Sequence, residues 1–315
     1  MGFMTQFAVS RVPARSLSRG VWQELRRVHL SPQVGKVSAV FERAFHVDFC
    51  SDEPVAVVSP DLGDGPLNIV LGERPGALPP PGVLVQVCPG TGRLAMGQLE
   101  ITLEGAAIWE PRPNWERLRS QVAAIQDRLP RLATLVLSLA PPDSLASILT
   151  PVADGQWTSR PATIPVAGQQ WADCVGSAVA DALGLLFVGL AADGPDLRVA
   201  ASRLAGLGRG LTPSGDDLLI GIMIWAWLAD PAPERICRPL LAGSHQRTTA
   251  WSAALLRAAG RGECSLAWHH LLETLQGHSD GEVAAAVHAV LDVGHTSGAD
   301  ALAGFIWMGL HARQP

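Results

Sequence analysis

Residues 206–221 read Gly206-Leu-Gly-Arg-Gly-Leu-Thr-Pro-Ser-Gly-Asp-Asp-Leu-Leu-Ile-Gly221 and join a glycine-rich turn to an apolar segment. The alternating glycines 206, 208 and 210 permit positive φ angles and a close approach of the backbone to a ligand. No residue from Leu218 to Ala229 is charged, which predicts a buried helix. The order of these features predicts a loop that carries function at the start of a core helix.

The centre of this stretch also has the composition of a helix N-terminus. Thr212 and Ser214 are suited to capping, and Pro213 to the first helical position. Asp216 and Asp217 are favoured by the helix dipole, so a well-capped helix is the plain alternative. That alternative leaves the three glycines unexplained. Backbone N–H groups without partners in the first turn make the anion-binding interpretation the preferred one.

A second, shorter copy of the pattern lies at Gly294-His-Thr-Ser-Gly-Ala-Asp-Ala-Leu-Ala-Gly304. Asp217 and Asp300 each precede a glycine by four residues, which places acid and glycine on one helix face. A glycine there leaves room for a ligand, a metal or another helix. We expect the two loops to face one another and enclose one polar site; the alternative is two similar helix caps.

The composition excludes several classes of function. Hydrophobic residues make up 48% and charged residues 17%, which supports a large core or a subunit interface. A net charge of −5 disfavours nucleic acid as a partner. The five cysteines form no CxxC pair, so reduced thiols are expected instead of a zinc site or disulfides. With no apolar run of about 20 residues, we expect a cytoplasmic protein without a membrane partner.

The fold class expected is α+β, with a small N-terminal β-sandwich or barrel and a mainly helical domain of buried apolar helices. Residues 1–112 form the β-rich domain and residues 113–315 the helical domain, which carries the two Thr-Ser-Gly-Asp loops. Short Val-, Ile- and Leu-rich runs separated by Gly and Pro predict the strands, namely 44–50, 55–59, 67–71, 83–87, 98–103 and 106–110. The predicted helices are 17–30, 114–129, 144–149, 171–190, 195–204, 235–243, 245–259, 262–276 and 280–292. Residues 132–139 fit a helix or a strand equally well.

Two further residues carry candidate chemistry. Arg247, followed by Thr248 at a predicted helix start, offers a planar guanidinium to phosphate or carboxylate. A solvated Arg beside a cap is the alternative. His295 lies within the second loop, where an imidazole can act as acid, base or hydrogen-bond donor.

The paired motifs 206–217 and 294–304 resemble a family that includes the AllH-type subunit of oxamate carbamoyltransferase, from anaerobic allantoin degradation, a route of purine catabolism. The stretch Arg247-Thr-Thr-x-x-Ser-Ala-Ala-Leu-Leu-Arg-Ala-Ala-x-x-Gly262 and the β-rich lead also resemble it. Where the family has Gly-Pro-Gly-Leu-Thr-Pro, this chain has Arg209 between the glycines. The resemblance implies a subunit that works with other chains to convert oxalurate and phosphate into oxamate and carbamoyl phosphate.

Residue type, loop position and resemblance together give the candidate site. The catalytic candidates are Asp217, Asp300 and His295. The substrate-binding candidates are Gly208, Arg209, Gly210, Thr212, Ser214, Gly215, Asp216, Arg247, Thr248, Thr296, Ser297 and Gly298. The expected ligand is a small anion, either phosphate, carbamoyl phosphate or a carboxylate, held by backbone N–H groups of the two loops. Asp216, Asp217 and Asp300 could instead hold Mg²⁺, which takes oxygen ligands, and no other cofactor is expected. A structural or regulatory subunit and a stand-alone anion-binding enzyme are the alternative functions.

Overall fold

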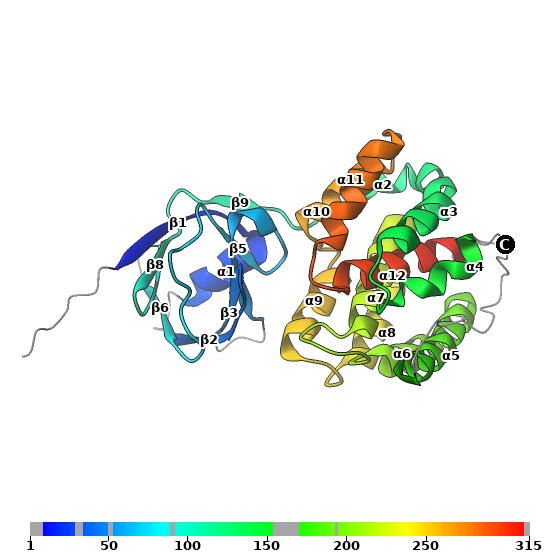
Figure 1. Cartoon of the computed structure of the whole chain (residues 1–315), viewed down its shortest axis with the longest axis horizontal. Helices are drawn as coiled ribbons and strands as arrows, with labels where there is room; N and C mark the ends of the chain where they lie inside the picture. The colour runs from blue at the N-terminus through cyan, green and yellow to red at the C-terminus, as the bar shows by residue number, and fades with distance from the viewer. Residues whose placement is uncertain are drawn as a thin grey trace, which may run out of the picture. The chain divides into compact units, whose positions relative to one another are not determined.

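The computed structural model describes residues 9–28, 34–49, 53–88, 92–153, 170–192 and 195–311. It separates into two compact units, Met1–Pro111 and Arg112–Pro315 (Figure 1). The first is a β-barrel with an extra strand and the second is helical, so the predicted α+β class is confirmed.

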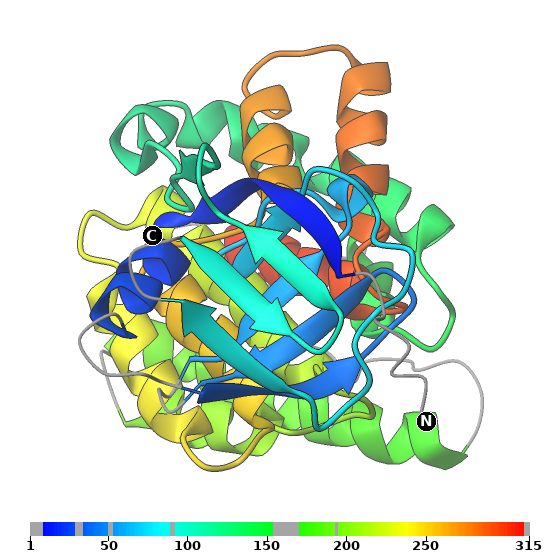
Figure 2. The same ribbon diagram turned by 90° about the vertical axis from the view of Figure 1, so that its left-hand side faces the viewer.

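The first unit is built from short strands that close on themselves. They are β1 (Ser10–Ser18), β2 (Val34–Val40), β3 (Ala44–Asp48), β4 (Val55–Val58), β5 (Asn68–Leu71), β6 (Leu84–Cys88), β7 (Arg93–Met96), β8 (Leu99–Thr102) and β9 (Ala107–Trp109). The strand order is β5-β4-β3-β2-β6-β7-β8-β1-β9, and β5 also pairs with β1, which closes the barrel (Figure 2). All six predicted strands are confirmed.

Three strands, β1, β2 and β7, were not predicted. In β1 the side chains alternate between exposed and buried, with Val12 and Ala14 inside and the neighbouring Arg11 and Arg15 outside. Such alternation is typical of a half-buried strand. Charged and proline residues on the outer face hid the pattern. The predicted helix over residues 17–30 corresponds to α1 (Arg19–Val28).

The second unit consists of helices and connecting segments within its described residues. They are α2 (Trp115–Arg119), α3 (Val122–Leu139), η2 (Leu145–Leu149), α4 (Thr150–Ala153), α5 (Gln170–Ala192), α6 (Asp196–Leu204), α7 (Ser214–Ala229), α8 (Glu234–Ser244), α9 (Ala250–Gly260), α10 (Leu266–Thr274), α11 (Asp280–Leu291) and α12 (Ser297–His311). No helix in the described ranges has the length and hydropathy needed to cross a bilayer.

The structure corrects two of the helix predictions and settles one segment that the sequence left open. The helix expected over 114–129 is broken after Arg119 into α2 and α3. The ambiguous segment 132–139 is helical, because it continues α3. The helix expected to start at His245 begins at Ala250, since the Thr249 side chain caps it by accepting from the Ser252 N–H at 3.0 Å.

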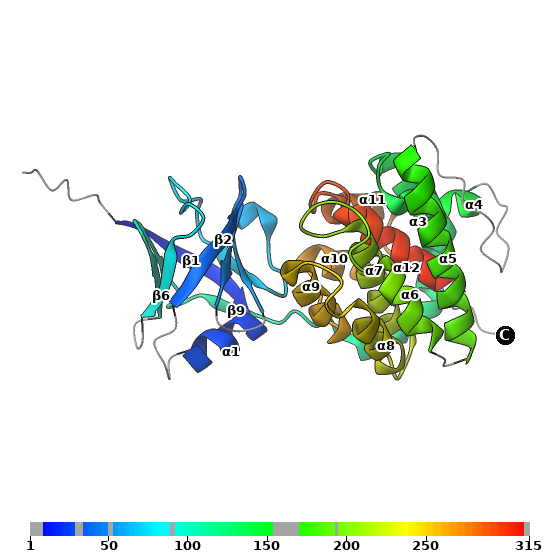
Figure 3. The ribbon, with the colours of Figure 1, turned by 90° about the horizontal axis from the view of Figure 1, so that it is seen from below.

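The core of the helical unit is centred on α7 and α12, which lie side by side (Figure 3). A methyl group added to Gly221 would overlap the carbonyl oxygen of Ala301, and one added to Gly304 would overlap that of Leu218. The two helices therefore cross with their backbones in direct contact. Gly221 contacts Ala301, which is three residues before Gly304, and Gly304 contacts Leu218, which is three residues before Gly221. The crossing is therefore close to two-fold symmetric.

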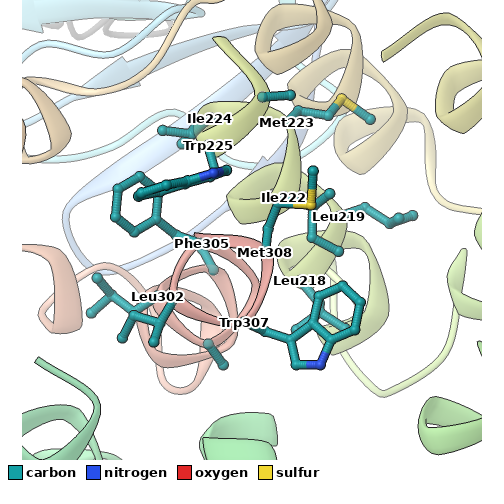
Figure 4. Close-up of a cluster of buried hydrophobic side chains, with 14 of the residues drawn as sticks. Leu218, Leu219, Ile222, Met223, Ile224, Trp225, Leu302, Phe305, Trp307 and Met308 are labelled. Atoms are coloured by element: carbon teal, nitrogen blue, oxygen red, sulfur yellow. The ribbon is translucent and has the colours of Figure 1, made fainter. Parts of the chain in front are cut away.

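Large apolar side chains surround this crossing and bury it completely. Trp225 of α7 and Phe305 of α12 are both 0% exposed, and their rings meet edge to face with centroids 5.0 Å apart (Figure 4). This packing explains why residues 218–229, which we predicted to form a buried helix, carry no charge.

We expect Gly221→Ala to lower the free energy of unfolding by about 3 kcal/mol, since a new methyl group separates two touching backbones. Gly184 in α5 is the matched control: a methyl group there meets nothing within 4 Å. Gly184→Ala should raise stability by roughly 0.5–1 kcal/mol through helix propensity. Urea unfolding of both variants measures the difference. Equal stability of the two alanine variants would contradict the close crossing.

Candidate functional site

The two motif loops, residues 206–213 and 292–296, come together at the N-terminal ends of α7 and α12. The hydroxyl oxygens of Thr212 and Ser297 are 2.8 Å apart and share a hydrogen bond. The two copies of the motif thus form one polar cluster, as their similarity led us to expect.

A third segment, residues 245–249, lies against the first loop. The Thr249 hydroxyl donates to the carbonyl oxygen of Leu211 at 2.6 Å. Gly206, with φ of 75°, packs so tightly on the Arg247 carbonyl that a side chain there would overlap it. The glycine is therefore required by backbone packing inside the protein, not by a ligand.

A fourth segment, residues 141–145, completes the cluster from the other side. The Leu145 N–H donates to Asp300 Oδ1 at 2.6 Å. Asp143 Oδ2 lies 3.2 Å from Nε2 of His295, and both side chains are more than half exposed. We call the exposed surface of these four segments (141–145, 206–213, 245–249 and 292–296) the loop face.

Asp217 and Asp300 are held by reciprocal contacts between the two motif copies. Hydroxyl groups of both loops lower the pKa of each acid: those of Ser297 and Thr212 act on Asp217, and those of Ser214 and Thr296 act on Asp300. Each motif therefore supplies a Thr to its own acid and a Ser to the other acid.

Burial controls the ionisation of both acids. Desolvation raises the pKa of Asp300 to about 6, although the Leu145 N–H and the hydroxyls oppose it. Desolvation also raises the pKa of Asp217 well above its usual range, and the nearby charge of Asp300 adds to this. Asp217 is 4% exposed and Asp300 0% exposed.

One oxygen of each carboxylate is left without a partner. Oδ2 of Asp217 and Oδ2 of Asp300 are buried and accept no hydrogen bond from any described group. An unpaired buried polar atom is costly, so these two oxygens are the acceptors best suited to an added proton or an N–H donor.

Asp216, by contrast, has both oxygens occupied. Its Oδ1 accepts from the Gly206 N–H at 3.1 Å, and its Oδ2 accepts from Ser252 at 2.9 Å and from the Thr248 hydroxyl. Burial raises its pKa, which these hydrogen bonds counteract. Asp216 thus ties the glycine loop to the start of α9.

Three backbone N–H groups of the expected anion site are hydrogen-bonded within the protein. The Gly215 N–H donates to Leu207 O at 2.8 Å, the Asp216 N–H to Pro213 O at 2.9 Å, and the Gly298 N–H to Val293 O at 3.2 Å. Pro213, which has no N–H, is the N-cap residue of α7, and no side chain caps that helix. The Thr212 hydroxyl, expected as a cap, shares a hydrogen bond with the Ser297 hydroxyl instead.

The candidate residues fall into three groups by exposure. Arg209, Gly210, Arg247 and His295 are exposed; Gly208, Thr212, Thr248, Thr296 and Ser297 are half-buried; Ser214, Gly215, Asp216, Asp217, Gly298 and Asp300 are buried. The exposed groups lie on the loop face and the acids lie beneath it. Their roles in binding and catalysis stay predictions.

Sequence reasoning missed the contributions of Asp143, Leu145 and Ser252. Ser252 is spaced four residues after Thr248, a signal that both contact one partner. Nothing in the sequence around Pro141 indicates that the Leu145 N–H reaches a carboxylate 155 residues away. No three His, Cys, Asp or Glu side chains of the described chain are arranged to hold a metal ion, so the Mg²⁺ option gains no support.

Comparison with known proteins points to the same region. Residues 204–309 match the family model described as oxamate carbamoyltransferase subunit AllH. The match confirms the resemblance noted from the motifs, and it spans both motif loops, Arg247 and His295. No solved structure matches the chain.

We expect the free energy of unfolding to fall as the pH rises and Asp300 loses its proton. Asp300 binds its proton more tightly in the folded state, so its contribution is fully present below the ordinary pKa of 3.8 and is lost as pH rises through about 6. The shift corresponds to about 3 kcal/mol. Asp300→Asn keeps the acceptor for Leu145 but cannot ionise, so it should flatten this part of the profile. Urea unfolding between pH 4 and 7.5 measures both proteins; parallel profiles would disprove the assignment.

Proposed function

We propose that this chain is a subunit of a carbamoyltransferase complex and binds a small anionic substrate at the loop face. The reaction is that of oxamate carbamoyltransferase: oxalurate and phosphate give oxamate and carbamoyl phosphate. The observation that carries the proposal is that the family match and the structural cluster coincide. Residues 204–309 contain both motif loops and Arg247, which converge in space.

Arg247 is the candidate anion-binding group. It is exposed, and its guanidinium makes no hydrogen bond or ion pair with any described residue. The preceding Gln246 has φ of 59°, a left-handed conformation that no other non-glycine residue of the described chain adopts. Backbone strain of this kind is found at ligand clamps. Arg209, exposed on the adjacent loop, adds a second positive charge.

The remaining polar groups are assigned two tasks, which are proton transfer to the leaving nitrogen and binding of the carbamoyl NH₂. Phosphate oxygen attacks the carbamoyl carbon of oxalurate, the bond from that carbon to the oxamate nitrogen breaks, and this nitrogen takes up a proton. His295, paired with Asp143 at 3.2 Å, is the exposed group able to carry that proton. The unpartnered Oδ2 atoms of Asp217 and Asp300 are acceptors for the carbamoyl NH₂.

A ligand specific to the folded chain should raise its melting temperature by mass action. Phosphate, carbamoyl phosphate, oxalurate and oxamate are each added at concentrations up to about 100 times Kd, where the expected stabilisation is about 2.7 kcal/mol. Arg247→Ala should abolish the shift. The matched control is Arg238→Ala, an exposed arginine in α8 that should leave the shift intact. A shift that survives in Arg247→Ala would exclude this arginine as the anion-binding group.

Asp217→Asn tests the amide-binding role in the assembled complex. Asn replaces one acceptor oxygen by an NH₂ donor, so a carbamoyl NH₂ would meet a donor in place of an acceptor. We expect activity to fall at least about a hundredfold with the melting temperature retained. The control is Asp230→Asn at the C-terminal end of α7, outside the loop face. Full activity of Asp217→Asn would rule out the role.

A structural or regulatory subunit is the second candidate function. It is favoured by the burial of Asp217 and Asp300, 4% and 0% exposed, and by the glycine contacts that hold α7 and α12 together. In that case the chain binds none of the four ligands, while the assembled complex is active and insensitive to Asp217→Asn.

A further inference from the structure

A cavity of about 260 Å³ lies between three helices of the helical unit. It is bounded by α3, by the C-terminal end of α10 and by the start of α11, which are labelled in Figure 1. All of its lining residues lie outside the loop face, so the proposed function does not use it. Pockets for drug-sized ligands have volumes of about 300–1,000 Å³, and this smaller cavity therefore suits a small metabolite.

The buried part of the cavity wall is aliphatic. Leu132 of α3, Leu275 at the end of α10 and Val283 of α11 line it and are 2%, 0% and 8% exposed. Leu135 and Ala284, which are half-buried, also line it. An aliphatic group of a ligand would lose its contact with water against this wall, which favours binding.

Two arginines of α3 line the same cavity. Arg128 and Arg131 are three residues apart and so lie on one face of the helix. Arg128 is fixed in place, because its Nη1 donates to the carbonyl oxygen of His278 at 2.8 Å. Arg131 is exposed and makes no hydrogen bond or ion pair with any described residue. Both guanidinium groups therefore have N–H donors left for a carboxylate.

The α11 side of the cavity carries one acid. Asp280 is the first residue of α11, is exposed, and makes no hydrogen bond or ion pair with any described residue. The helix dipole favours an acid in a first turn, which is the plain explanation of this residue. Its carboxylate is also the one acceptor side chain among the charged groups that line the cavity, and it is suited to an ammonium group. The cavity thus combines donors for an anion, an acceptor for a cation and an aliphatic wall.

We propose that this cavity binds a free α-amino acid with an aliphatic side chain. Arg128 and Arg131 bind the carboxylate of the amino acid, Asp280 binds its ammonium group, and the aliphatic wall takes its side chain. The volume is that of one small molecule, so a single ligand contacts groups from both helices. A carboxylate without the ammonium group is repelled by Asp280, and an amine without the carboxylate is repelled by the arginines. The zwitterion is therefore the ligand whose charges match the lining.

Calorimetric titration of the full-length chain with L-leucine tests the ligand class. Three analogues each lack one of its groups: isocaproate has no ammonium group, isoamylamine has no carboxylate, and glycine has no apolar side chain. We expect leucine to bind and each analogue to bind about tenfold more weakly or worse, because the matching protein group then loses its partner. Equal affinity for isocaproate and leucine would overturn the assignment of an amino acid. Absence of binding by leucine, isoleucine and valine would overturn the site itself.

Substitutions of the charged side chains test the location of the site. Arg131→Gln and Asp280→Asn should each weaken leucine binding about tenfold or more, since each removes a charge that pairs with the ligand. Arg238→Gln, at an exposed position of α8, and Asp196→Asn, in the first turn of α6, are matched controls outside the cavity. The controls should change Kd less than about twofold, because distant sites act independently.

Filling the cavity gives a readout that does not depend on charge. Ala284→Phe adds a ring at a lining position and should abolish leucine binding, whereas Ala285→Phe, at the exposed next position, should leave it unchanged. Melting temperatures confirm that the variants are folded. Leucine binding that survives in both Ala284→Phe and Arg131→Gln would place the ligand elsewhere and overturn the proposal. The proposed carbamoyltransferase function does not depend on either result.

Discussion

The backbone contact between α7 and α12 is the constraint on which the helical unit depends. Gly221 and Gly304 each pack on a carbonyl oxygen of the opposite helix, so no side chain fits between them. With this distance set, residues four positions earlier, Asp217 and Asp300, are brought to the same end of the crossing. The glycine that the sequence offered as room for a ligand, a metal or a helix therefore makes room for a helix.

The two-fold character of the crossing extends into the polar cluster. Each acid interacts with a Thr of its own loop and a Ser of the other, so neither motif is satisfied without its partner. Such exchange makes the two loops one cooperative unit. It also buries two like-charged groups close together, which is tolerable only when at least one carries a proton. The polar cluster consequently links the two motif loops through buried acids whose pKa values are raised by burial.

The groups proposed to act on a ligand lie where this rigid base meets the exposed loops. The buried acids lie underneath, whereas Arg247 and His295 are exposed on the loop face. One short motif can therefore stabilise the helix crossing and also carry the proposed binding groups.

Local pattern in the sequence was sufficient for six of the nine described strands, for the buried helix after Asp217 and for the pairing of the two loops, because periodicity and repeated motifs are local signals. Local pattern was not sufficient to predict which way the polar side chains point. Thr212 and Ser214 look like caps, and only tertiary contact shows that their hydroxyls turn to the acids. The backbone N–H groups look available until Leu207 and Val293 accept from them. Leu145 reaches Asp300 from 155 residues away, and such long-range hydrogen bonds depend on how the helices pack. The tertiary structure alone decided which polar groups were left without a partner.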